Sequence, residues 1–195
     1  MPDGTGMRGA ILEAAVGILQ REGAGALTVR SVSSAAGCST TGVYTWFGGK
    51  HGLIEAIFVD GFQRFGAAQR AVRRGRTRRA SDLSRYAHAY RDWALANPTH
   101  YMVMFGRAVP DFEPSEHALA AAAETFEQLV EAVQEATSSA GSTDDPAQVA
   151  HHLWASVHGY VSLELAGMHD ATASPAERDR RFRAGIERIR VGCGI

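Results

Sequence analysis

The segment Leu27–Lys50 has the sequence LTVRSVSSAAGCSTTGVYTWFGGK and contains the clearest local folding signals in this chain. Thr28 and Ser39 each precede a run of helix-compatible residues, and both side chains can cap a helix by accepting a hydrogen bond from its backbone. Apolar residues recur at three- and four-residue spacing after each cap, which is typical of one helix face. Gly37 lies between the two runs, and glycine ends helices because it adopts left-handed backbone angles without steric cost. The segment therefore predicts two short helices joined by a tight turn, a helix-turn-helix.

The second of these helices has a predicted inner and outer face. Val43, Trp46 and Phe47 are expected to point inward. The outward residues are small or carry a hydroxyl group, so this helix can enter a groove and reach phosphates and base edges. Lys50 follows at the start of the next helix, where its ammonium group and the free backbone N–H groups suit a phosphate. The outward residues are Thr40, Thr41, Gly42, Tyr44 and Thr45.

This pattern resembles the DNA-binding domain of TetR-family transcriptional regulators, which implies a bacterial, cytoplasmic protein. The matching elements are a Thr-capped helix, Ala-Gly, a Ser-capped recognition helix, Tyr, an aromatic-Phe pair and Lys-x-x-Leu. Cys38, Gly48-Gly49 and His51 depart from the family pattern without removing a phosphate or base contact. The resemblance implies that the threonines of the recognition helix meet or lie near base edges, while Thr28, Tyr44 and Lys50 hold phosphates. The predicted DNA-binding residues are Thr28, Ser39, Thr40, Thr41, Gly42, Tyr44, Thr45 and Lys50.

Charge is distributed unevenly along the chain, although the net charge of the whole is −1. Residues 1–80 contain 11 Lys and Arg against 5 Asp and Glu, whereas residues 81–195 contain 9 against 16. This asymmetry indicates a basic half that faces nucleic acid, joined to an acidic body. The most basic stretch, Arg70–Arg79, is interpreted as a solvated helix end, with extra attraction for phosphates as the alternative.

Helical periodicity along the whole chain predicts an all-α protein of two domains. A helix over about Met7–Glu22 completes a three-helix DNA-binding domain at residues 1–50, and Arg8 near its start is either a contact to the DNA backbone or a solvated side chain. A helix from Lys50 to about Val72 connects this domain to a body at residues 51–195. Two cysteines are too few for a disulfide framework, and no apolar run is long enough to span a membrane. No signal-peptide pattern is expected at the N-terminus. Helices of the body are predicted from Ser81 to before Asn97, from Pro98 to Gly106, and over Ala118–Thr137, Pro146–Met168 and Pro175–Val191.

The helix after Pro146 has apolar residues on more than one face, as expected of a helix that is either buried on all sides or meets another subunit. Its Trp-x-x-x-His-Gly sequence, together with ANPTHYMVMFG at residues 96–106, resembles the ligand-binding and dimerisation domain of a TetR subgroup. The resemblance implies a homodimer through the last two helices that reads a near-palindromic double-stranded operator. It also implies a small-molecule effector that is mostly apolar. Core packing is the alternative role for each candidate ligand-binding residue, namely Tyr86, Tyr90, Trp93, Tyr101, Met102, Phe105, Phe126, Trp154 and His158.

Other functions are less well supported by the sequence. His151 and His158 are two helical turns apart, so hydrogen bonding is a better interpretation than metal binding. We find no nucleophile elbow or glycine-rich phosphate loop, and we predict neither a cofactor nor enzymatic activity. The prediction is a ligand-responsive, DNA-binding transcriptional regulator, a repressor that a small molecule releases from its operator. The alternatives are an architectural DNA-binding protein without an effector and an all-helical enzyme that binds a small molecule.

Overall fold

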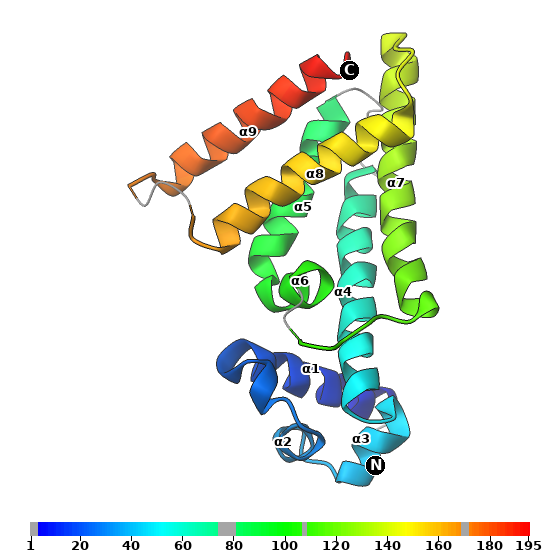
Figure 1. The fold of residues 1–195 in the computed structure, drawn as a ribbon, viewed down its shortest axis with the longest axis vertical. Helices are drawn as coiled ribbons and strands as arrows, with labels where there is room; N and C mark the ends of the chain where they lie inside the picture. The colour runs from blue at the N-terminus through cyan, green and yellow to red at the C-terminus, as the bar shows by residue number, and fades with distance from the viewer. Residues whose placement is uncertain (1–3, 74–80, 107–108, 169–171) are drawn as a thin grey trace. The chain divides into compact units, whose positions relative to one another are not determined.

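The computed structural model describes residues 4–73, 81–106, 109–168 and 172–195, and every regular element within them is helical (Figure 1). The all-α prediction is therefore confirmed. No helix in these ranges is long and apolar enough to cross a membrane. The elements are α1 (Gly4–Glu22), the 3-10 helix η1 (Ala24–Ala26), α2 (Val29–Ala35), α3 (Thr40–Phe47), α4 (Lys50–Arg73), α5 (Ser81–Ala96), α6 (Pro98–Phe105), α7 (Glu116–Ala140), α8 (Pro146–Leu165) and α9 (Pro175–Gly192).

The chain divides into two compact units. Unit 1 consists of Met1–Gln63 and Asn97–Ala122, and unit 2 consists of Arg64–Ala96 and Ala123–Ile195. Both α4 and α7 contribute residues to each unit. The predicted domain boundary at residue 50 stays a prediction.

Within unit 1, α1, α2 and α3 pack in sequence, α1 against α2 and α2 against α3 (Figure 1). Thr28 Oγ1 accepts a hydrogen bond from the Ser31 backbone N–H at 3.0 Å, and Ser31 Oγ accepts one from the Thr28 N–H at 3.0 Å. This reciprocal pair satisfies backbone groups that the first turn of α2 leaves without a helical partner. Ser39 caps α3 by accepting from the Gly42 N–H at 3.1 Å, and Gly37 has a φ of +65°. Both predicted caps and the predicted glycine stop are confirmed.

Glycines shape the turn between α3 and α4. Gly48 and Gly49 have φ values of +69° and +120°, in the region that favours glycine. Gly52 serves a different purpose, because a Cβ atom there would lie 1.9 Å from the carbonyl oxygen of Phe47. The first turn of α4 thus lies directly against the last residue of α3.

The rest of unit 1 joins α4 to the second segment of the unit. The Phe62 ring lies 5.4 Å from that of Phe105, and the Phe58 ring lies 5.9 Å from that of Phe112, centroid to centroid. The Glu55 carboxylate accepts hydrogen bonds from the backbone N–H of Ser115 at 3.3 Å and from its hydroxyl at 3.0 Å. Residues before Gln63 and residues after Asn97 therefore share one core.

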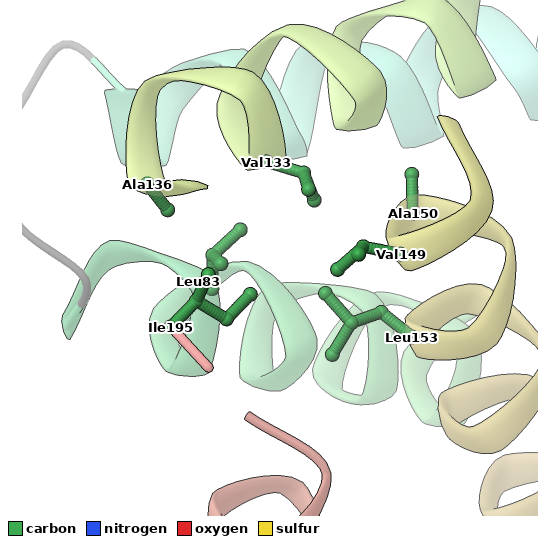
Figure 2. Close-up of a cluster of buried hydrophobic side chains, with 7 residues drawn as sticks. All are labelled: Leu83, Val133, Ala136, Val149, Ala150, Leu153 and Ile195. Carbon is green, nitrogen blue, oxygen red and sulfur yellow. The ribbon is translucent and has the colours of Figure 1, made fainter. Parts of the chain in front are cut away.

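Unit 2 is built around buried aliphatic side chains from α5, α7, α8 and the C-terminus, which point toward one another (Figure 2). Ile195 is only 6% exposed and closes this core, so the end of the chain packs against the helices. The buried members are Leu83, Val133, Ala136, Val149, Ala150, Leu153 and Ile195.

Several predicted helix boundaries differ from those of the structure. α1 begins at Gly4 instead of Met7, and α7 extends over Glu116–Ala140, beyond both predicted ends. α8 ends at Leu165 instead of Met168, because Gly167 has a φ of +67° and stops the helix. In the basic stretch Arg70–Arg79, residues 74–79 lie outside the described residues, and Arg70 pairs with Glu124 at 3.3 Å.

Candidate functional site

The predicted DNA-binding residues all lie in unit 1, on α3, on the residues that cap α2 and α3, or at the first position of α4. Thr28, Ser39, Thr40, Thr41, Tyr44, Thr45 and Lys50 are exposed, and Gly42 is half-buried. Behind them, Val43 is completely buried and Phe47 is 8% exposed. α3 is therefore held by an apolar inner face and presents a hydroxyl-rich outer face, as predicted.

Hydrogen bonds within the protein determine whether two of these hydroxyl groups can donate to a ligand or only accept from it. Thr45 Oγ1 donates to the carbonyl oxygen of Thr41 at 2.9 Å, and Thr28 Oγ1 donates to Ser31 Oγ at 2.9 Å. With their protons engaged, Thr45 and Thr28 can accept from a ligand without losing these bonds. Tyr44, with 57% of its surface exposed, projects its phenol outward.

Trp46 was predicted to point inward, and the structure contradicts this because the residue is 42% exposed. The reason is geometric, since Val43 and Phe47 are four residues apart and already fill the inner face of this eight-residue helix. The guanidinium carbon of Arg8 lies 5.3 Å from the centroid of the Phe47 ring. Arg8 therefore stabilises the domain through a cation–π contact.

An open cleft of about 640 Å³ adjoins the start of α4. Lys50 Nζ donates to the carbonyl oxygen of Ala24 at 3.4 Å, and the His51 ring contacts Phe112 at 5.4 Å between centroids. The Lys50 ammonium group is thus held against η1, beside this cleft, by a contact that a phosphate can replace. The cleft is lined by Ala24, Gly25, Lys50, His51, Ile54, Val109, Pro110, Asp111 and Phe112.

Unit 2 contains a group of touching rings, which we call the aromatic cluster. The Phe65 ring lies 4.9 Å from Tyr90 and 5.2 Å from Trp93, and the Trp154 ring lies 5.9 Å from His158 and 6.0 Å from Phe126. The Tyr90 hydroxyl joins the two halves through a 3.0 Å hydrogen bond with His158 Nδ1. The cluster consists of Phe65, Tyr90, Trp93, Phe126, Trp154 and His158.

Burial lowers the pKa of His158, because a charged imidazole is poorly solvated at this position. His158 is therefore a neutral hydrogen-bonding side chain near neutral pH. His151 contacts the rings of Phe126 and Trp154, and the described residues include no group of three or more His, Cys, Asp or Glu side chains that could hold a metal ion.

The nine predicted ligand-binding residues are divided between the two units. Five of them belong to the aromatic cluster, and Tyr86 is buried in the same unit. Tyr101, Met102 and Phe105 belong to unit 1, where Tyr101 and Phe105 are in ring contact at 5.0 Å. Met102 is 44% exposed.

A buried ion-pair network in unit 2 was missed by the sequence analysis. Arg91 Nε donates to Glu164 Oε2 at 2.5 Å, and Arg91 Nη2 donates to Glu164 Oε1 at 2.6 Å. Asp179 lies 3.5 Å from Arg91 Nη1, and the Phe182 ring centroid lies 5.2 Å from the Arg91 guanidinium carbon. The hydrogen bonds to Glu164 raise the pKa of Arg91, which keeps its charge. The network ties α5 to both α8 and α9.

Two buried glutamines, Gln69 on α4 and Gln128 on α7, were also missed. Each is at least nine-tenths buried, and no donor in the described part of the chain reaches the side-chain oxygen of either one. A signal for Gln69 was present, because it stands four residues after Phe65, at the next position on the same apolar helix face.

Comparison with known proteins identifies both halves of the chain. A model of bacterial regulatory proteins of the tetR family matches residues 11–57. A model of the tetracyclin repressor-like C-terminal domain matches residues 83–189, which is over half of the chain. No curated protein matches the chain significantly.

Solved structures share the whole fold. SCO4313, named as a candidate regulatory protein, is 25% identical with a TM-score of 0.80, over 95% of this chain and 96% of that one. A Rhodococcus sp. RHA1 protein of unknown function is 23% identical with a TM-score of 0.83, over 97% and 96% of the two chains. PfmR, a TetR-family transcriptional regulator from Thermus thermophilus, is 18% identical with a TM-score of 0.69, over 92% and 96%.

Proposed function

We propose, because this chain belongs to the tetR family of bacterial regulatory proteins, that it represses transcription and leaves its operator when a small molecule binds to unit 2. The N-terminal helix-turn-helix is the DNA-binding part, as in the family. The observation that carries the proposal is α3, whose exposed hydroxyl-rich face is backed by the buried Val43 and Phe47. Such a face can enter a major groove, where base edges carry sequence information.

The proposed DNA contacts follow from the chemistry of each side chain. Thr40, Thr41 and Thr45 meet base edges or lie beside them, while Tyr44, Thr28 and Lys50 hold phosphates. Ser39 and Gly42 shape the N-terminus of α3 through their hydrogen bond. We expect phosphate contacts to set affinity and threonine contacts to set sequence preference.

The proposed assembly is a homodimer through α8 and α9. These helices expose Tyr160 (40%), Leu163 (51%) and Val191 (64%), which are large apolar side chains that a subunit contact would cover. A two-fold dimer would present its recognition helices about 34–36 Å apart, so the operator would be a near-palindrome. The dimer would populate several arrangements of its two DNA-binding domains. An effector that binds more tightly to an arrangement that does not fit the operator would lower the population of the arrangement that binds DNA.

The test is operator binding by fluorescence anisotropy at two salt concentrations, with fragments from the neighbourhood of the protein's own gene. We expect saturable binding to one near-palindromic fragment, well above binding to random DNA. Lys50→Ala should weaken binding and reduce the salt slope by about 1, because one phosphate contact is lost. Arg85→Ala, which removes an exposed arginine of α5, outside the proposed DNA contacts and the proposed dimer interface, is the matched control and should change neither quantity.

One result would favour the architectural alternative. Weak binding that is equal on all fragments and collapses with salt would mean that only phosphate attraction operates. The proposed repressor would then be wrong, and an unchanged salt slope in Lys50→Ala would refute the role of this side chain.

A further inference from the structure

Gln69 is a polar residue placed inside the apolar interior of unit 2. It is 4% exposed, and its side-chain oxygen is buried without a hydrogen-bond donor from any described residue. Leaving a buried carbonyl oxygen without a donor costs about 1–3 kcal/mol, so native proteins almost always supply one. A donor from outside the chain is therefore expected at this position.

The location of Gln69 points to the aromatic cluster. Gln69 follows Phe65 by four residues on α4, and side chains at this spacing lie one above the other on the same helix face. The Phe65 ring contacts Tyr90 and Trp93 at 4.9 and 5.2 Å. The amide of Gln69 thus lies one turn away from a group of rings that suits an apolar molecule.

Gln128 supplies a second buried acceptor on α7. Its Nε2 donates to the Glu124 carboxylate at 3.5 Å, and because a carboxylate only accepts, this bond sets the orientation of the amide. The side-chain oxygen of Gln128 therefore faces away from Glu124, and it is buried without a donor. Both buried amides lack the same partner, an N–H or O–H group.

The charges of unit 2 disfavour an ionised ligand in this interior. Arg70, half-buried beside Gln128, is already paired with the Glu124 carboxylate at 3.3 Å. Arg91 is the buried cationic side chain in the described part of the unit, and its guanidinium group is already held by Glu164 at 2.5 and 2.6 Å and by Asp179 at 3.5 Å. His158 stays neutral because its pKa is lowered by burial. A carboxylate or an ammonium group buried here would lose its hydration without gaining a partner of opposite charge.

We infer that the effector of unit 2 is an uncharged molecule with a mainly apolar body and one hydroxyl or amide N–H group, and that it donates a hydrogen bond to Gln69. This inference rests on the effector-controlled function proposed above. Gln69 is assigned as a specificity-determining residue, because its side-chain oxygen can accept a hydrogen bond from a donor group but cannot pair with an anion. Because this oxygen is buried, the hydrogen bond should contribute strongly to the affinity.

The first experiment measures the affinity of matched probes for the full-length protein by isothermal titration calorimetry, without DNA. One series is octanol, octanoate and heptyl methyl ether, and the other is naphthol, naphthoate and methoxynaphthalene. We expect the alcohol or phenol of at least one series to bind roughly tenfold more tightly than its ether, because only the former donates to the buried oxygen. The carboxylates should bind most weakly.

The second experiment repeats the titrations with Gln69→Met, which keeps the length of the side chain and removes its oxygen. The preference for the donor over the ether should disappear. Gln63→Met is the matched control, because Gln63 is an exposed glutamine of the same helix and should leave the preference unchanged. Without any probe, Gln69→Met should unfold at a higher temperature than the wild type, because it removes an unsatisfied buried acceptor.

Three results would overturn the inference. The first is tighter binding of the carboxylates. The second is an equal affinity for alcohols and ethers that Gln69→Met does not alter. The third is no binding of any probe; a lowered melting temperature of Gln69→Met would then indicate that buried water holds Gln69. Since calorimetry uses no DNA, these failures are distinct from the failure of operator binding, which alone would refute the proposed repressor.

Discussion

Replacing Gly52 with alanine should damage the turn between the recognition helix and α4. The added Cβ atom would lie 1.9 Å from the Phe47 carbonyl oxygen, so about 1.1 Å of separation must be gained to reach even the 3.0 Å that real contacts rarely undercut. The obstructing atom belongs to the backbone and cannot move away by a change of rotamer. Strain of this kind costs typically about 1–3 kcal/mol, and more where the backbone has to move.

Alanine also has an opposing effect, because it favours a helix over glycine by about 0.5–1 kcal/mol. The strain exceeds this gain, so we expect Gly52→Ala to lower the free energy of unfolding by about 2 kcal/mol. Gly9→Ala is the matched control, since Gly9 lies in α1 and a Cβ atom added there would meet nothing within 4 Å beyond its own helix backbone. Gly9→Ala should therefore raise the free energy of unfolding by about 0.5–1 kcal/mol.

The assay is urea denaturation of both variants at constant pH, followed by operator binding. Gly52→Ala should shift the midpoint down and weaken DNA binding, because the last turn of α3 moves with the Phe47 carbonyl. If Gly52→Ala were as stable as Gly9→Ala and bound DNA normally, the close approach of α3 and α4 would not exist as described.

Three further predictions concern caps and buried charges. Glu164→Gln should lower the free energy of unfolding by about 3–5 kcal/mol, because it leaves the buried Arg91 charge poorly compensated. In urea denaturation, the double variant Arg91→Met with Glu164→Leu should recover most of this loss. An absence of recovery would refute the explanation. Because burial lowers the pKa of His158, the folded state resists its protonation, so stability should fall as the pH drops below about 6.5. A urea-midpoint series should show a smaller fall in His158→Gln, and an equal fall would contradict this origin. Thr28→Ala should cost about 1 kcal/mol by removing the cap of α2, whereas Thr28→Ser should retain most of it in thermal unfolding, and equal losses would exclude capping as the cause.

Features that depend on residues close in the chain were predictable from the sequence. Thr28, Ser39 and Gly37 act within three or four positions of themselves, so residue type alone indicated the caps and the stop. Most helix boundaries followed in the same way. The all-α architecture needed only the spacing of apolar residues.

Features that depend on distant residues were not predictable. Arg91 and Glu164 are 73 positions apart, and nothing in either neighbourhood signals their pairing. Trp46 was misplaced because periodicity does not show how much of a short helix its neighbours cover. The assignment of Tyr101, Met102 and Phe105 to unit 1 likewise depends on packing between segments that lie far apart along the chain.

Unit 1 is assembled from two separate stretches of chain, and this has consequences for synthesis and for engineering. Phe58 and Phe62 of α4 rest on Phe112 and Phe105, and Glu55 binds Ser115, so the first 63 residues lack part of their core until the later segment arrives. On the ribosome, the DNA-binding half should therefore mature only after residue 122 has emerged. A chimera that exchanges the N-terminal 63 residues alone would join mismatched surfaces, whereas one that also carries residues 97–122 keeps the partners together.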